Sequence, residues 1–258
     1  MQTFEFWINF CYSCRSYVQE TSIVVVFDNV VKAFPASWWG QTKRKDVLKG
    51  VSFEAQPGQI MGFWGANGAG KTTAFRILAG LERWDSGDVV VNGRSARSDP
   101  QWVRHNVSIL LEKHGFHKMS GRLVLEQTGL CMGFDLKHAR QRTQELVEQL
   151  DMSDFIEHTA DKYSRGQLGR LGIARMMVDP SPILIFDEPT VGLDFASADR
   201  VRKYIRSCAS NGHTVLLATH LLSDIKTLCD HVVGLDQGVV VAPETVTQWL
   251  RSQEEITS

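Results

Sequence analysis

The first third of the chain alternates short apolar runs with turn residues, and this pattern predicts β-strands. Residues 22–30, SIVVVFDNV, form a β-branched run, and a second strand is expected within 47–55. Pro57 and Gly58 predict a turn, after which residues 59–64, QIMGFW, have the composition of a buried strand. Because this strand runs into a glycine-rich loop and then into the helical pattern TTAFRILAGL, we expect a strand, a loop and a helix in that order.

The pattern is mostly helical between about residues 99 and 179 and then returns to strands. The clearest amphipathic helix is predicted within RQRTQELVEQLDMSDFI. Three further apolar runs, at 183–187, 214–219 and 231–236, alternate with helical segments. Strands that alternate with helices predict a parallel sheet covered on both faces. The sequence therefore predicts an α/β core that flanks an inserted helical subdomain.

Composition and charge exclude some classes of protein. The 258 residues are 43% hydrophobic and 22% charged, which is ordinary for a folded chain with a sizeable core. With 28 basic and 29 acidic residues there is no positive excess, so we expect no nucleic-acid partner. The five cysteines lack regular spacing, which favours a reducing compartment over a disulfide framework. Cys11 and Cys14 form a single C-x-x-C without a second pair, so no zinc site is expected.

Residues 1–21 are rich in aromatic side chains but do not have the pattern of a membrane span. Polar residues break the run, which is shorter than the roughly 20 apolar residues that a bilayer helix needs. We interpret this segment as an extension, possible roles being interfacial contact or partner binding. No other run is long and apolar enough to cross a membrane, so a membrane role would require a partner chain.

A glycine-rich loop carries the strongest chemical pattern in the chain. Residues 65–73, GANGAGKTT, fit G-x-x-x-x-G-K-[ST], in which backbone N–H groups surround nucleotide phosphates. The lysine would lie against the outer phosphates, and the threonine that follows it would bind Mg²⁺. A plain glycine turn is the alternative, but the full pattern favours ATP or GTP binding. The predicted cradle residues are Gly65, Ala66, Asn67, Gly68, Ala69, Gly70, Lys71, Thr72 and Thr73.

Two acidic residues follow the apolar run ILIF. Asp187 and Glu188 would lie at the carboxyl end of a strand, where open α/β sheets bind ligands. Asp187 would meet the Mg²⁺ that Thr72 binds from the other side. Glu188 would orient or deprotonate the attacking water, because adjacent strand residues point to opposite sides. An ordinary strand exit is the alternative, and the upstream phosphate loop makes it the weaker one.

The segment YSRGQ, residues 163–167, precedes the helical spacing of LGRLGIARMMV. A serine-glycine-glutamine signature that opens a helix shortly before an Asp-Glu strand resembles the ATPase subunit of ATP-binding cassette (ABC) transporters, which usually reads LSGGQ. Tyr163 and Arg165 depart from that pattern, whereas Ser164, Gly166 and Gln167 keep it. A serine N-cap is the alternative explanation of this segment, but its order and spacing relative to the other motifs favour the resemblance.

The resemblance covers residue 23 to about 245 and implies roles for further residues. Phe34 would stack on adenine, with an ordinary core aromatic as the alternative. His220 would reach the γ-phosphate, although a lone histidine after a strand is more often structural. Asp194, in VGLD, would lie in the segment that crosses to another subunit. Glu112 stands where most of the family has a glutamine that contacts Mg²⁺ and the attacking water, and its added negative charge would tighten Mg²⁺ or slow turnover.

The resemblance also implies a fold, cofactors and partners. The expected fold is a P-loop NTPase core with a mostly parallel sheet, an antiparallel β subdomain and an inserted helical subdomain. The ATPase domain would span 22–245, its helical subdomain about 99–179, and residues 246–258 would form a tail. ATP and Mg²⁺ would lie between two ATPase subunits, the second being another copy of this chain or a paralogue, so that the signature of one contacts the nucleotide of the other. Separate permease subunits would hold the protein at the cytoplasmic face of the membrane.

Similarity of FDEPTVGLD and VSILLE to export ATPases favours an exporter. An importer ATPase and a soluble cassette ATPase with a regulatory or mechanical role are the alternatives. The sequence does not identify the transported substrate, because the ATPase domains of this family do not contact it.

The segment PASWWGQTKRKD lengthens a predicted hairpin between Phe34 and the strand at Val47. It contains Trp38, Trp39 and the three basic residues 43–45. A solvated loop is one interpretation, and contact with a permease or with acidic lipid headgroups is the other. Similar hairpins occur in ATPases that export polysaccharides or lipid-linked glycans, which slightly favours that substrate class.

Overall fold

The computed structural model describes residues 24–38, 41–110 and 118–257, and these residues form two compact units. The core unit contains the described residues up to Ile109 together with Ser181–Glu188 and Ile205 onward. The helical unit contains the described residues of Leu110–Pro180 together with Pro189–Tyr204. The helical unit therefore begins later than the expected residue 99, and a second stretch of chain contributes to it.

A six-stranded, mostly parallel sheet forms the centre of the core unit. Its order is β10-β9-β3-β8-β7-β6, in which β9, β3, β8 and β7 are parallel and β10 is antiparallel to β9. All residues of β3, β7 and β8 are buried, which explains why these strands are continuous apolar runs. The strands are β3 (Ile60–Trp64), β6 (Val107–Leu110), β7 (Ile183–Asp187), β8 (Thr214–Ala218), β9 (His231–Asp236) and β10 (Val239–Val241).

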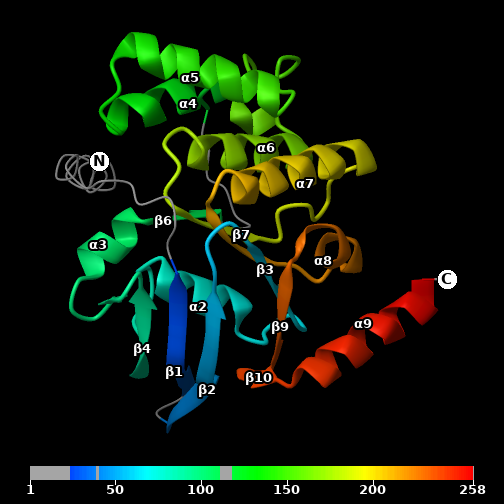
Figure 1. Cartoon of the computed structure of the whole chain (residues 1–258). Coiled ribbons are helices and arrows are strands. Elements are labelled where there is room, and N and C mark those ends of the chain that lie inside the picture. The colour runs from blue at the N-terminus through cyan, green and yellow to red at the C-terminus, as the bar shows by residue number, and fades with distance from the viewer. Residues whose placement is uncertain (1–23, 39–40, 111–117, 258) are drawn as a thin grey trace. The chain divides into compact units, whose positions relative to one another are not determined.

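A second, antiparallel sheet of the core unit has the order β2-β1-β4-β5 (Figure 1). Strands β1 (Val25–Trp38) and β2 (Gln41–Ala55) pair along their length, with local register shifts. The shorter β4 (Ser86–Val91) and β5 (Arg94–Ser95) complete this sheet. The expected elongated hairpin is present, and the residues from Pro35 to Arg44 that the structure describes are paired strand rather than open loop.

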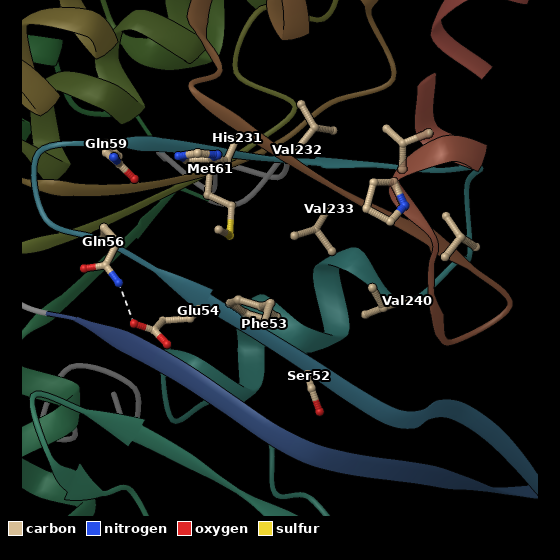
Figure 2. Close-up of a pocket in the computed structure, with 13 residues that line it drawn as sticks. Ser52, Phe53, Glu54, Gln56, Gln59, Met61, His231, Val232, Val233 and Val240 are labelled. Carbon is tan, nitrogen blue, oxygen red and sulfur yellow. Dashed lines mark hydrogen bonds between the residues drawn. The ribbon is translucent and has the colours of Figure 1, made fainter. Parts of the chain in front are cut away.

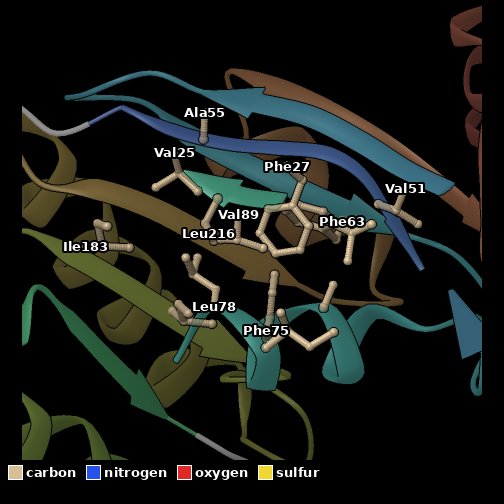
Figure 3. Close-up of a cluster of buried hydrophobic side chains, with 14 of the residues drawn as sticks. Val25, Phe27, Val51, Ala55, Phe63, Phe75, Leu78, Val89, Ile183 and Leu216 are labelled. Atoms are coloured by element: carbon tan, nitrogen blue, oxygen red, sulfur yellow. The ribbon is translucent and has the colours of Figure 1, made fainter. Parts of the chain in front are cut away.

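Aromatic rings connect the two sheets directly and also hold helix α2 (Lys71–Leu78) against β3. Phe53 of β2 stacks on Phe27 of β1 at 4.4 Å and meets Phe63 of β3 edge to face at 4.8 Å. Phe63 in turn meets Phe75 of α2 at 5.0 Å (Figure 3). Burial of each such side chain stabilises the fold by about 1.5–3 kcal/mol. The cluster fixes α2, and with it the loop before α2, against β3.

The remaining helices divide between the two units. The core unit contains α3 (Pro100–His105), α8 (Leu222–Leu228) and α9 (Pro243–Thr257). In the helical unit, α4 (Gly121–Cys131) and α5 (Leu136–Gln149) lie side by side in Figure 1. The helical unit also contains a short 3₁₀ helix (Ala160–Lys162), α6 (Arg165–Met176) and the first part of α7 (Phe195–Ser210).

Two parts of the structure differ from the expected pattern. Within the range expected to be helical, Val107–Leu110 is a strand of the main sheet, and Ile183 donates a backbone hydrogen bond to Asn106 beside it. The expected tail at 246–258 is largely helix α9, and Val246 is buried.

Residues 1–21 lie outside the described part of the chain. None of the helices in the described residues is both long and apolar enough to span a bilayer.

Candidate functional site

Three parallel strands of the core unit bring the predicted nucleotide residues to one edge of the sheet. Phe63 of β3 and Asp187 of β7 both pair with Ala218 of β8, so the three strands end at the same level. The glycine-rich loop follows β3, and Glu188 follows β7. His220 follows β8 after one intervening residue, which places all three segments at the carboxyl edge where open α/β sheets bind ligands.

The glycine-rich loop forms a close turn into α2. A Cβ atom on Gly65 would lie 2.1 Å from the carbonyl oxygen of Leu235, so a larger residue does not fit. Gly70 has a φ of 114° and is the N-cap of α2, with no side chain capping the helix. The first N–H groups of a helix have no partner within the helix. An anion at this end of α2 therefore meets free backbone donors and the positive end of the helix dipole.

Lys71 is buried against the loop that precedes it. Its Nζ donates to the carbonyl oxygens of Gly65 at 2.6 Å and Ala66 at 3.2 Å. Burial lowers the pKa of Lys71, and the nearby carboxylates of Glu188 and Asp187 act in the opposite direction. The ammonium group thus lies against the loop. If a nucleotide were bound, phosphate oxygens would replace the two carbonyl oxygens as its hydrogen-bond acceptors.

Thr72 and Asp187 form a pair of oxygen ligands suited to Mg²⁺. The Thr72 hydroxyl donates to Oδ2 of Asp187 at 2.8 Å, and Asp187 is 6% exposed. A hydroxyl and a carboxylate are hard oxygen donors, and Mg²⁺ commonly takes few protein ligands together with phosphate oxygens and water. The described residues contain no cluster of three or more acidic, histidine or cysteine ligands, so the ion would depend on the nucleotide for part of its coordination. These two residues fit the metal predicted from the sequence.

Glu188 and His220 are in direct contact. Nδ1 of His220 lies 2.9 Å from Oε1 of Glu188, and the backbone N–H of His220 donates to Oε2 at 3.4 Å. Glu188 has a φ of 52°, a conformation uncommon for residues with a side chain, while its N–H donates to the carbonyl of Ala218 at 2.9 Å. The Glu188 side chain is 13% exposed and that of His220 is 47% exposed. The carboxylate is therefore held by the segment that follows β8.

Phe34 lies on β1 with a charged neighbour over its ring. Nζ of Lys32 is 4.5 Å from the ring centroid of Phe34 and 2.7 Å from a carboxylate oxygen of Glu82. Phe34 is half-buried. On the paired strand β2, the side chain of Leu48 would lie 2.7 Å from a Cβ atom on Gly70, so β2 packs closely on the phosphate loop. Sequence reasoning missed Lys32, although a lysine two residues before Phe34 on the same strand face was a usable signal.

The signature residues of the helical unit begin α6. Ser164 Oγ accepts from the Gln167 N–H at 3.2 Å, and Gln167 Oε1 accepts from the Ser164 N–H at 2.9 Å, which together form a capping box. The serine hydroxyl keeps its own proton for donation to a further acceptor. A Cβ atom on Gly166 would lie 3.3 Å from Leu193, so the residue before Asp194 packs against the signature. The exposed Arg165 extends past Gly192 of the same segment.

Tyr163, where the usual signature has leucine, is buried in the helical unit. Its hydroxyl accepts from the Gly121 N–H at 3.2 Å and lies 3.2 Å from the Ile156 carbonyl, to which it donates. Its ring meets Phe155 edge to face at 4.9 Å. A Cβ atom on Gly121 would lie 2.4 Å from the hydroxyl, so Tyr163 and Gly121 fit as a pair. The departure at Tyr163 thus has a packing explanation.

Asp194 directly precedes α7 and accepts hydrogen bonds from Ser197. The distances are 2.9 Å from the Ser197 N–H and 2.6 Å from its hydroxyl. These hydrogen bonds hold the pKa of Asp194 below its usual value. Asp194 therefore caps α7 in the helical unit, and its role toward another subunit stays a prediction.

Glu112, the residue expected near Mg²⁺ and the attacking water, lies outside the described residues.

A separate cavity of about 360 Å³ lies elsewhere in the core unit (Figure 2). Strands β2, β3, β9 and β10 and the start of α9 line it, with Phe53, Met61 and Val233 among its apolar side chains. It contains none of the predicted nucleotide residues.

Comparison with known proteins agrees with this geometry. A family model described as "ABC transporter" matches residues 48–191. The ABC transporter ATP-binding protein NatA of Bacillus subtilis is 29% identical over 83% of this chain and 90% of its own length. The daunorubicin resistance ATP-binding protein DrrA2 of Streptomyces coeruleorubidus is 36% identical over 78% of this chain. This chain spans 63% of the length of DrrA2, so it matches less than two thirds of that relative.

Solved structures have the same fold at lower identity. A dimeric structure of the ATP-binding cassette MJ0796 bound to ADP and Pi superposes with a TM-score of 0.74, at 21% identity over 84% of this chain and 97% of that one. The structure of cbiO1 from Clostridium perfringens, described as part of the ABC transporter complex cbiONQ, gives a TM-score of 0.73. It is 20% identical over 90% of this chain and 94% of that one.

Proposed function

Because the chain belongs to the ABC transporter family, we propose that it is the ATP-binding and ATP-hydrolysing subunit of an exporter whose permease is formed by separate chains. The family membership predicted from the motifs is confirmed, and with it the α/β fold with one parallel and one antiparallel sheet. The observation that carries the proposed chemistry is the convergence of Lys71, Thr72, Asp187, Glu188 and His220 at one sheet edge.

The phosphate groups of ATP would occupy the end of α2. The backbone N–H groups of the loop and the helix dipole favour the negative charge there. Lys71 would exchange its bonds to the carbonyls of Gly65 and Ala66 for bonds to phosphate oxygens. Phe34, with Lys32 above its ring, would stack on the adenine.

Thr72 and Asp187 are the residues that would hold Mg²⁺. When bound, the ion would neutralise the charge that develops on the transferred phosphate. Glu188 would accept a proton from the attacking water, and His220 would hold its carboxylate by the two contacts seen in the structure. The φ of 52° at Glu188 turns the chain, so that Asp187 faces Thr72 while Glu188 faces His220.

A second ATPase subunit would complete each site. The signature residues Ser164, Arg165, Gly166 and Gln167 would contact the nucleotide held by the other subunit, with the free proton of the Ser164 hydroxyl directed to a phosphate oxygen. Family membership supports this arrangement. A donor supplied in trans can change the rate of phosphoryl transfer by about 10³–10⁵-fold in other enzymes.

Export is supported by the names of several relatives. DrrA2 and the DrrA protein of Streptomyces peucetius carry names of drug resistance, and the latter is 34% identical over 77% of this chain. This chain spans 60% of the length of that DrrA protein, so the activity and cargo of these whole proteins are proposals here. The proposed location is the cytoplasmic face of the membrane, where the permease would hold the subunit.

The decisive experiment uses the purified full chain with ATP and Mg²⁺. We expect hydrolysis in the wild type and a loss of about 10²–10⁴-fold in Glu188→Gln, with ATP binding retained. Gel filtration of Glu188→Gln with ATP should yield a dimer that contains trapped nucleotide. Glu157→Gln is a matched control, because this exposed glutamate pairs with Arg122 in the helical unit and should leave hydrolysis unchanged.

Two outcomes would contradict the proposal. A wild-type protein that neither binds nor hydrolyses ATP would exclude the ATPase function. If Glu188→Gln shows neither dimerisation nor trapped nucleotide, the two-subunit site is wrong. Copurification of the untagged partner from native membranes, followed by identification of its transmembrane segments, tests whether separate chains form the permease.

A further inference from the structure

The segment that carries His220 is held by two fully buried polar side chains. Thr219 and Asp224 both have 0% exposure, although threonine and aspartate are usually exposed. The Thr219 hydroxyl donates to Oδ2 of Asp224 at 3.3 Å and accepts from the Leu221 N–H at 3.0 Å. The two bonds therefore fix the residues directly before and after His220.

The backbone adds two further bonds to the same turn. The Thr219 N–H donates to the Phe63 carbonyl at 3.4 Å, at the end of the strand that leads into the phosphate loop. The Asp224 N–H donates to the Leu221 carbonyl at 3.1 Å. The turn is therefore attached to β3 at one end and to α8 at the other.

Helix α8 is itself packed closely on β3. A Cβ atom on Gly62 would lie 2.5 Å from Sγ of Cys229 and 3.0 Å from Cδ1 of Ile225, so any larger residue at this position of β3 would displace side chains at the end of α8. Burial raises the pKa of the Cys229 thiol to about 12, and the charge of Asp224 acts in the same direction. Asp224 thus links α8, which packs on β3, to the turn that carries His220.

We propose that Asp224 and Thr219 are positioning residues that hold the turn at Thr219–Leu221 so that His220 meets Glu188. This inference rests on the proposed ATPase function. An acidic residue in the first turn of a helix is favoured by the helix dipole, which is a purely local explanation of Asp224. That explanation accounts neither for its complete burial nor for its bond to Thr219, because a surface aspartate would serve the dipole equally well.

The test compares three substitutions in the full chain. Thr219→Val keeps the shape of the side chain and removes both hydroxyl bonds, whereas Thr219→Ser keeps the hydroxyl. Asp224→Asn keeps the size of the carboxylate and removes its charge. Thr227→Val is the matched control, because its hydroxyl bonds to the Ser223 carbonyl within the same helix and lies on the exposed side of α8.

We expect Thr219→Val and Asp224→Asn to lower kcat by roughly ten- to a hundredfold, since small misplacements of reacting groups cost this much. ATP affinity, measured with Mg²⁺, should stay within about twofold of the wild type, because neither residue would touch the nucleotide. Thr219→Ser should retain most of the activity, and Thr227→Val should match the wild type. Equal losses in affinity and kcat, or a Thr219→Ser variant as slow as Thr219→Val, would overturn the proposal.

A second measurement does not depend on activity. The ¹³Cε1 NMR signal of His220, assigned by its loss in His220→Gln, reports whether the imidazole still meets Glu188. We expect this signal to move toward that of an unpaired imidazole in Thr219→Val and to stay in place in Thr219→Ser. An unchanged signal in both Thr219→Val and Asp224→Asn would overturn the proposal. An inactive wild type would instead contradict the proposed ATPase function.

Discussion

The hydroxyl of Thr72 lies 2.8 Å from Oδ2 of Asp187, although 115 residues separate the two in the chain. The pairing follows from the sheet, because β3 and β7 flank β8 and end at the same level. It links the phosphate loop to the acidic strand end through one contact. This contact is also the place where the structure best fits Mg²⁺.

Removal of the Thr72 hydroxyl should weaken metal binding specifically. Thr72→Val leaves the shape of the side chain and deletes one of the two oxygen ligands proposed for Mg²⁺. We expect the affinity for ATP with Mg²⁺ to fall by roughly ten- to a hundredfold, as for other losses around metal sites. Titration without Mg²⁺ is the internal control and should give nearly wild-type affinity for ATP. A similar loss with and without the metal would show that Thr72 acts only on the phosphates.

Replacement of Phe34 tests the adenine platform. Phe34→Leu removes the ring and keeps an apolar side chain, whereas Phe34→Tyr keeps the ring. We expect Phe34→Leu to weaken ATP binding by an amount comparable to one base-stacking contact, about 1–3 kcal/mol. Phe34→Tyr should bind like the wild type in the same titration. If Phe34 is an ordinary core aromatic, Phe34→Leu will lower stability and leave ATP affinity unchanged.

The buried ammonium of Lys71 predicts a pH dependence of stability in the protein without nucleotide. Burial lowers the pKa of Lys71 in the folded state below its ordinary value of 10.5. Between these two pKa values the unfolded chain binds more protons than the folded chain, so the free energy of unfolding rises with pH in that window. The wild type should therefore gain stability relative to Lys71→Met as the pH rises toward 10.5.

Urea unfolding of both proteins at about pH 7 and about pH 10 measures this difference. The comparison between the two pH values removes the constant effect of the lost carbonyl bonds. A stability difference that is the same at both pH values would contradict the pKa shift.

The hydroxyl of Tyr163 should matter for stability and not for chemistry. Tyr163→Phe removes two buried hydrogen bonds, so that the Gly121 N–H keeps only its 3.4 Å bond to the His158 carbonyl and the Ile156 carbonyl keeps only the Arg122 N–H at 3.0 Å. We expect a loss of about 1–3 kcal/mol in the free energy of unfolding, measured with urea, and an unchanged kcat. A stable variant with impaired hydrolysis would instead make Tyr163 a nucleotide contact.

Shortening of the β1–β2 hairpin separates partner contact from catalysis. Replacement of residues 36–43 by Asn-Gly joins Pro35 to Arg44 through a two-residue turn and keeps the ion pair of Arg44 with Asp85 at 3.0 Å. We expect ATP hydrolysis by the isolated subunit to stay intact while assembly with the membrane partner weakens. Copurification from membranes measures assembly, and an unchanged yield of partner would exclude the hairpin as a contact.

Much of the candidate site could be predicted from the sequence, because most of its residues belong to short contiguous motifs. The glycine-rich loop and the pair Asp187 and Glu188 each place the required residue types within a few positions of a strand end. The buried strands β3, β7 and β8 were also predictable, since full burial on both faces demands continuous apolar runs. The strand at Val107–Leu110 was missed, because a four-residue run inside a helical pattern is ambiguous without its neighbours.

By itself the sequence determined the family, the nucleotide chemistry and where the main strands lie along the chain, because local spacing sets which residues can share a turn or a strand end. Only the tertiary structure showed that Thr72 meets Asp187, that Glu188 meets His220, and that Tyr163 is part of a packing pair. It alone revealed the buried bond between Thr219 and Asp224. These contacts join segments through strand order, register and close packing, which no local pattern of side chains specifies.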